Sequence, residues 1–178
     1  MAKQLKPKER LQFALLDRLT DEGSETSDRD EEGRERRVSA EKRLREKLLR
    51  DLAWLFNTTR LERDDEMAHL PYARHSVINF GLPAHAGETA SSIEIEDLEQ
   101  EIRQAILDFE PRILPETLEV KAIADLTDTD LDRHNVLGIQ IRARFWAQPV
   151  PLELLLRTEI DLETGKVQVA DLASSRVS

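Results

Sequence analysis

The sequence contains no cysteine, few aromatic residues and no hydrophobic run long enough to cross a bilayer. Without cysteine, the chain has no disulfide, no thiolate nucleophile and no cysteine metal site. Aromatic residues make up only 4% of the 178 residues, so any core must be compact and aliphatic. The N-terminus also lacks the apolar stretch of a secretory signal peptide. We therefore expect a soluble, cytoplasmic protein that does not insert into a membrane.

Basic residues are outnumbered as well. The chain has 36 acidic and 26 basic side chains, for a formal net charge of −10. A surface of this sign repels phosphate backbones and anionic lipid. Nucleic acid is therefore disfavoured as a partner.

Motifs of the common enzyme classes are missing. The sequence has no phosphate-binding loop, no dinucleotide fingerprint, no G-x-S-x-G elbow and no H-E-x-x-H pair. A glycosidase needs two carboxylates at a set distance, but among 36 acids some pair always meets that distance. Few aromatic residues are present to line a sugar site. We predict no catalytic residue, no cofactor and no metal. The four histidines are expected at the surface, and they are His69, His75, His85 and His134.

The chain divides into an N-terminal extension, residues 1–37, and a folded domain, residues 38–178. In the extension, Leu15, Leu16 and Leu19 fall on one helical face and predict a short amphipathic peptide. No large apolar residue occurs from Thr20 to Arg37, which predicts a flexible linker. The peptide either docks on its own domain or binds a partner.

Two stretches with an apolar period of 3.6 predict the main helices. The first begins at Ser39, as an N-cap, and ends near Asn57. The second runs from Ser92 to Phe109, with Ser91 and Glu94 arranged as a capping box and with Pro111 ending it. The apolar positions of the two stripes are Leu44, Leu48, Leu52, Leu55 and Phe56, and Ile95, Leu98, Ile102, Ile106 and Phe109.

Between the helices, Ser76 to Phe80 predicts a short strand or a buried extended segment, closed by a turn at Gly81 to Pro83. After Pro115 the apolar period changes to two. The alternation predicts strands over residues 118–122, 137–145, 152–162 and 166–170. The expected fold class is α+β: an antiparallel sheet of three to four strands with two main helices on one face, plus a flexible N-terminal extension.

Two groups of residues are candidates for a protein interface. Glu110, Pro111 and Arg112 lie where the second helix meets the sheet, and the proline stiffens this corner. A fixed acid and guanidinium there either pair with nearby charges or project from the corner and dock a partner.

The second group lies on the solvent face of the predicted 137–145 strand and just beyond it. Arg142, Arg144 and Trp146 alternate with buried positions. A solvated sheet face is one interpretation. A tryptophan beside two arginines also indicates a protein interface.

Four segments in order resemble TssE, the baseplate subunit family of bacterial type VI secretion systems. They are Leu15 to Asp21, Leu49 to Arg60, Ser76 to Pro83, and Phe109 to Leu114 with its Glu-Pro-Arg motif. The resemblance implies a structural role in the cytoplasm, at the inner face of the cytoplasmic membrane. It implies wedge assembly with TssF and TssG, contacts with TssK and the spike hub, and a platform on which the sheath subunits TssB and TssC begin to polymerise.

Strand addition at a sheet edge is the mechanism that this resemblance implies for sheath initiation. The candidate edge is the C-terminal hairpin, Leu152 to Ala170, whose outer charges limit pairing to a complementary partner. Two alternatives remain: a peptidoglycan-cleaving, lysozyme-like hydrolase, since phage relatives have carried a lysozyme label, and an adaptor that binds through its N-terminal peptide.

Overall fold

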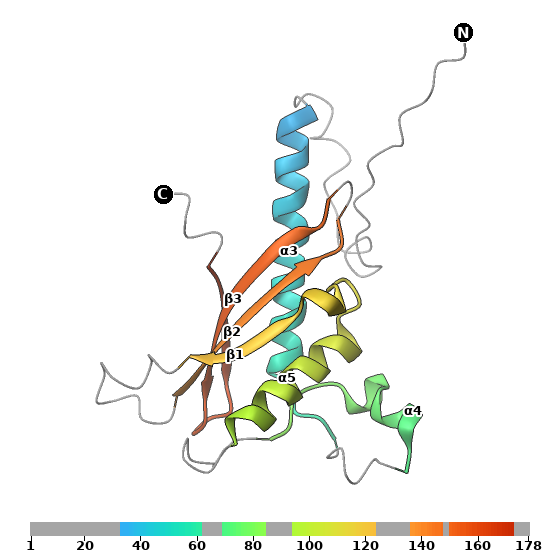
Figure 1. Ribbon diagram of the computed structural model, residues 1–178, viewed down its shortest axis with the longest axis vertical. Helices are drawn as coiled ribbons and strands as arrows, with labels where there is room; N and C mark the ends of the chain where they lie inside the picture. Colours follow the sequence, from blue (N-terminus) through green and yellow to red (C-terminus); the bar gives the residue numbers. More distant parts are fainter. Residues whose placement is uncertain (1–32, 62–68, 85–93, 124–135, 148–149, 173–178) are drawn as a thin grey trace.

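A four-stranded antiparallel sheet in the order β1-β2-β3-β4 forms one layer, and two helices form the other (Figure 1). The computed structural model describes residues 33–61, 69–84, 94–123, 136–147 and 150–172. The strands are β1 (Glu119–Ile123), β2 (Val136–Phe145), β3 (Leu152–Asp161) and β4 (Val167–Asp171). The helices are α3 (Gly33–Phe56), α4 (Pro71–Arg74) and α5 (Ile95–Phe109), with 3₁₀ turns η1 (Val77–Asn79) and η2 (Pro115–Thr117).

The predicted fold class and all four predicted strands are confirmed. In β2, Ile141, Ala143 and Phe145 are almost fully buried, whereas Arg142 and Arg144 between them are exposed. One face of the sheet therefore carries the core, as an apolar period of two requires.

The helices α3 and α5 cover this inner face (Figure 1). Their predicted stripes are buried: at most 4% of any of the five α3 positions is exposed, and in α5 Leu98, Ile102 and Ile106 are at most 2% exposed. By contrast, Ile95 is 47% exposed. None of the helices in the described ranges is both long and apolar enough to cross a membrane.

Both predicted helix starts are wrong. The helix α3 begins at Gly33 rather than Ser39, because its first turns are rich in arginine and glutamate, which favour helix without contributing to an apolar stripe. The helix α5 begins at Ile95, with Glu94 as its N-cap residue and no side-chain capping bond. Glu94 therefore does not occupy the third helical position that a capping box requires. The linker predicted from Thr20 to Arg37 overlaps α3 over residues 33–37, and the rest of it lies outside the described residues.

The strand or buried segment predicted from Ser76 to Phe80 is also wrong. The chain forms the 3₁₀ turn η1 there, and Val77 and Ile78 are 82% and 64% exposed. The Ser76 hydroxyl accepts a hydrogen bond from the Ile78 N–H at 3.3 Å, which starts the turn.

The predicted turn at Gly81 is confirmed. Its φ is +125°, and a Cβ there would lie 2.2 Å from the Thr58 carbonyl oxygen. This close approach lets Leu82 donate to the Thr58 carbonyl at 2.8 Å and accept from the Arg60 N–H at 2.9 Å. Only glycine fits such a backbone. Gly81 therefore allows the segment after η1 to pair with the residues that follow α3.

Candidate functional site

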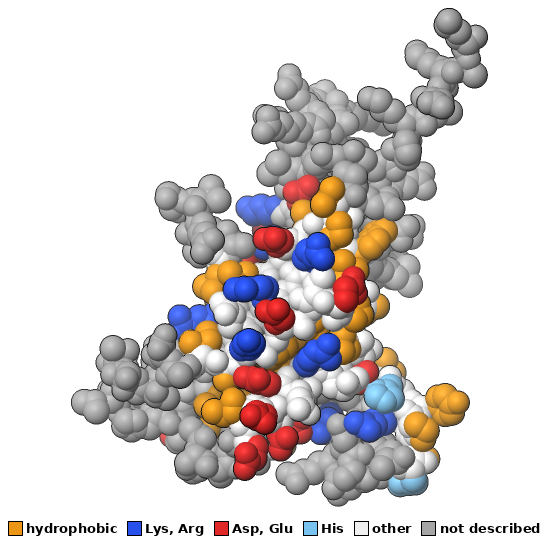
Figure 2. Space-filling model, in the orientation of Figure 1, with side chains coloured by type: hydrophobic (Ala, Val, Ile, Leu, Met, Phe, Trp, Pro, Cys, Tyr) orange, Lys and Arg blue, Asp and Glu red, His pale blue; other side chains and the backbone are white. Residues whose placement is uncertain are grey.

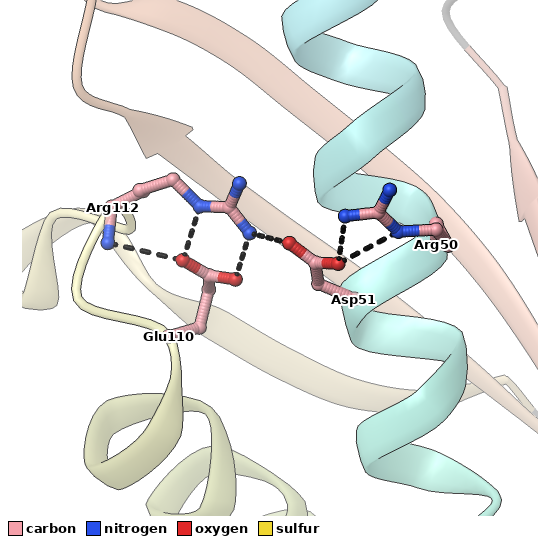
Figure 3. A network of polar contacts seen from close by, with 4 residues as sticks. All are labelled: Arg50, Asp51, Glu110 and Arg112. Carbon is pink, nitrogen blue, oxygen red and sulfur yellow. Dashed lines mark hydrogen bonds and ion pairs between the residues drawn. The ribbon is translucent and has the colours of Figure 1, made fainter. Parts of the chain in front are cut away.

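The Glu-Pro-Arg corner is an internal ion pair as well as a bend. The chain leaves α5 at Glu110, and Pro111 turns it back so that Arg112 faces the preceding acid. Arg112 donates from Nε to Oε1 of Glu110 at 2.6 Å and from Nη2 to Oε2 at 2.5 Å (Figure 3). This two-pronged pairing is the strongest geometry between a guanidinium and a carboxylate.

The pair continues onto α3. Arg112 also donates from Nη2 to Oδ2 of Asp51 at 2.6 Å. Arg50 donates to the other oxygen, Oδ1, of Asp51 at 2.7 and 3.0 Å. Four charges of alternating sign therefore connect the end of α5 with the middle of α3, as Figure 3 shows.

Burial decides what each member of this network can do. Glu110 is only 5% exposed, so the prediction that it projects from the corner is wrong, and its pairing with nearby charges is confirmed. Burial alone lowers the pKa of Arg112, but hydrogen bonds and charge from Glu110, and then from Asp51, raise it above the ordinary value. The guanidinium is therefore charged at every accessible pH. In the described part of the chain, its buried Nη1 has no hydrogen-bond partner.

Main-chain hydrogen bonds join the corner to the end of β2. Trp146 donates its N–H to the Arg112 carbonyl at 2.7 Å, and Leu114 donates to the Arg144 carbonyl at 2.9 Å. Ile113 and Phe145 form an isolated antiparallel bridge between these bonds. The structure thus brings the two predicted groups of interface residues side by side.

The outer face of the sheet presents the second group. Arg142 lies opposite Glu119 of β1, and Arg144 lies opposite Glu153 of β3. Among the described residues, neither guanidinium has an ion-pair or hydrogen-bond partner. Trp146 is 36% exposed.

Charge alternates over this face (Figure 2). A groove of about 590 Å³ runs across it, and its polar lining includes Glu116, Thr117, Arg142, Arg144 and Glu153. The groove thus offers two arginines that have no partner among the described residues, beside acids of the neighbouring segments. Such a surface fits a protein segment better than a small molecule, because it is open and lined by charged as well as apolar side chains.

The two sheet edges differ. At the β1 edge, Glu99 of α5 accepts a hydrogen bond from the Ala122 N–H at 2.7 Å. At the β4 edge, the amide side chain of Asn57 pairs with both the N–H and the C=O of Val167. Sequence reasoning missed both contacts, because it marked Asn57 only as a helix terminator and gave Glu99 no role.

The remaining predicted site residues, Leu15, Leu16 and Leu19, lie outside the described residues, so the amphipathic peptide and its docking place stay predictions. Asp51 is the site residue that was missed altogether. It lies 61 positions from Arg112, and no local pattern links them. No group of three or more histidine, aspartate or glutamate side chains suited to a metal occurs in the part of the chain that the structure describes.

A family model described as "Baseplate wedge protein gp25" matches residues 42–150, which is more than half of the chain. The chain belongs to the gp25 family of baseplate wedge proteins. TssE is the type VI secretion homologue of gp25, so the resemblance seen in the sequence is confirmed. Membership of the gp25 family gives the protein a structural role in a baseplate, in contact with other baseplate components. Neither the curated proteins nor the solved structures include a match to the chain.

Proposed function

We propose that the protein is the TssE-type wedge subunit of a type VI secretion baseplate. It assembles with TssF and TssG in the cytoplasm, at the inner face of the membrane, and contacts TssK and the spike hub. It also starts the TssB and TssC sheath by accepting a strand, and it acts without catalysis. Membership of the gp25 family and the four resembling segments support this proposal.

The observation that carries sheath initiation is a position on the β4 edge whose outward main-chain groups have no partner in the described chain. A new strand needs free main-chain groups. A helix packs against each edge strand, α5 against β1 and α3 against β4, and Glu99 of α5 occupies the Ala122 N–H at the β1 edge. At β4, the side chain of Asn57 pairs with the main chain of Val167. It does not pair with Val169, the next residue whose main chain points out from the edge.

The register shows where Val169 points its main chain. The strands β3 and β4 are hydrogen-bonded between Leu155 and Leu172 and between Asp161 and Lys166. In an antiparallel pair such bonds alternate, so Val169, opposite Thr158, directs its N–H and C=O away from β3. In the described chain no hydrogen bond is made by either group. This is the position at which a sheath strand can add.

Wedge assembly belongs to the outer face of the sheet in this proposal. Arg142, Arg144 and Trp146 are accessible to a partner, whereas Glu110 is buried. Glu110 and Arg112 therefore act as positioning residues that hold the end of β2 in place. The partner segment supplies carboxylates to the two arginines and an apolar contact to Trp146.

The experiment separates the two surfaces in native cells that carry a fluorescent sheath subunit. Val169→Pro removes the outward N–H and replaces the side chain, a change that an edge strand tolerates. We expect this variant to co-purify with TssF and TssG but to form no sheaths. Val169→Ala, which removes more side chain but keeps the N–H, is the control and should form sheaths normally.

Arg144→Glu combined with Trp146→Ala should lose TssF and TssG while the isolated protein stays folded. Sheaths in the Val169→Pro cells would refute strand addition at β4. Failure of the wild-type protein to recover wedge subunits would refute the type VI assignment itself.

A further inference from the structure

The segment between α3 and α5 presents a cluster of apolar side chains to solvent. We call Leu70, Tyr72, Val77 and Ile78 the apolar knob; their exposed fractions are 48%, 93%, 82% and 64%. No residue of α4 is buried. In Figure 1, α4 stands clear of the sheet, and Figure 2 shows hydrophobic and histidine side chains together at that place. Grouped apolar exposure of this kind marks an interaction site more often than single exposed residues do.

The knob is held rigidly although its apolar side chains are exposed. The Ser76 hydroxyl donates to the Ala73 carbonyl at 2.8 Å, and Asn79, only 3% exposed, donates its N–H to the Ser76 carbonyl at 2.9 Å. Phe80 packs edge-on against Phe109 of α5 with ring centroids 5.2 Å apart. A segment fixed in this way loses little conformational entropy when it binds.

The charge of the segment differs from that of the rest of the chain. Residues 69–84 contain no aspartate or glutamate, although the whole sequence has 36. Arg74 is the only lysine or arginine in these residues, and His75 lies 2.8 Å from Asp108. An apolar surface that carries an arginine and no acid is complementary to an apolar pocket bordered by carboxylates.

We propose that the apolar knob inserts into an apolar pocket bordered by carboxylates on a neighbouring baseplate subunit. This inference rests on the proposed function and adds a contact apart from the outer sheet face and the β4 edge. A second copy of the chain meeting it knob to knob is disfavoured, because two protrusions cannot enclose each other and two Arg74 side chains would face one another.

The first test compares two valines that are both exposed. Val77→Asp places a carboxylate on the knob, and Val150→Asp places one at an exposed position, 65% accessible, just before β3. The full-length chain is co-expressed with TssF and TssG of the same system, and the recovery of the complex is measured. We expect Val77→Asp to lower recovery at least tenfold and Val150→Asp to leave it unchanged, with equal melting temperatures for both.

Normal recovery with Val77→Asp overturns the knob inference and leaves the proposed function standing. Failure of the wild-type chain to recover any wedge subunit overturns both.

The second test finds the occupant directly. A photo-crosslinking phenylalanine analogue replaces Tyr72 in native cells, which is a mild change because that ring is 93% exposed. We expect crosslinks to one peptide of another baseplate subunit in which acidic residues flank apolar ones. Crosslinks to residues 1–32 of the same chain, or to a second copy, contradict the proposal.

Discussion

The side-chain amide of Asn57 pairs with the main chain of Val167 as a neighbouring strand would. Its Nδ2 donates to the Val167 carbonyl at 2.8 Å, and its Oδ1 accepts from the Val167 N–H at 3.0 Å. The same Nδ2 reaches the Ala53 carbonyl at 2.8 Å. One side chain thus closes the end of α3 and occupies one position of the β4 edge.

Replacing Asn57 should loosen β4 locally. Asn57→Ala leaves the Val167 N–H and C=O without their partners, and we expect it to cost about 1–3 kcal/mol of unfolding free energy. Asn57→Asp should also destabilise, because it loses the donor to Val167 and places a carboxylate against a carbonyl. Urea denaturation gives the cost, and hydrogen exchange at the Val167 amide should speed up. The exposed Gln168→Ala is the control, and unchanged exchange in Asn57→Ala would contradict this role.

The Arg112 pairing should contribute to stability as well as to assembly. Arg112→Ala leaves the buried Glu110 carboxylate without a counter-charge, and we expect a loss of about 2–4 kcal/mol. The loss should shrink in a Glu110→Gln background, where no buried charge remains. Chemical denaturation of the two single variants and the double variant measures this coupling. Strict additivity of the two changes would rule out the ion pair as the cause.

A consequence concerns experiments on the motif itself. A failure of Arg112→Ala to assemble does not identify a docking residue unless its stability is measured alongside. The exposed Arg144 and Trp146 are better positions for testing docking, because their side chains have no ion pair in the described chain.

Gly81→Ala should destabilise strongly. The new methyl group would sit 2.2 Å from the Thr58 carbonyl oxygen, at a φ of +125° that other residues rarely adopt. We expect a cost of about 2–4 kcal/mol or a chain that does not fold. Gly165, at φ +69°, is the comparison, since Gly165→Asn places a residue that tolerates left-handed backbone. Thermal unfolding of the Gly81→Ala and Gly165→Asn proteins measures the difference, and equal melting temperatures would refute the steric argument.

The β3–β4 turn should respond to acid. Hydrogen bonds from the Thr164 hydroxyl and N–H, and from the Glu163 N–H, lower the pKa of Asp161 below its usual value. Since the folded state favours the carboxylate, this contribution to stability is present above the unfolded pKa of about 3.9 and is lost as pH falls through the lowered folded pKa. A carboxyl NMR titration measures it. Asp161→Asn should abolish the dependence, and an unshifted Asp161 titration would disprove it.

The spacing of apolar residues correctly predicted the helices and strands that bury one face. It gave a wrong prediction for the short segment η1, where burial does not follow from the local pattern. The strands 137–145 and 152–162 were predicted because Ile139, Ile141 and Leu154 alternate with polar residues. The prediction that Val77 and Ile78 are buried is wrong, because a short apolar run has the same pattern whether it enters a core or forms an exposed turn.

The site was only partly predictable for a different reason. The corner residues were found from the proline that ends α5, but their partner Asp51 belongs to another helix. Which carboxylate meets Arg112 depends on how α3 crosses α5, and no local spacing contains that information. The β4 edge was predicted as exposed, whereas its partial cover by Asn57 emerges only when the end of α3 lies against β4.

The contacts of Arg45 join parts of the chain that are synthesised at different times. Arg45 of α3 pairs with Asp171 of β4, 126 positions later, and donates to the Glu153 carbonyl of β3. The helix emerges from the ribosome long before the strand that neutralises Arg45, so this ion pair forms only after Asp171 has been synthesised. A chain truncated before Val167 would leave the ten residues of β3 as a bare edge, open to pairing with any strand. An intact β4 therefore keeps the β3 edge from pairing with a wrong strand.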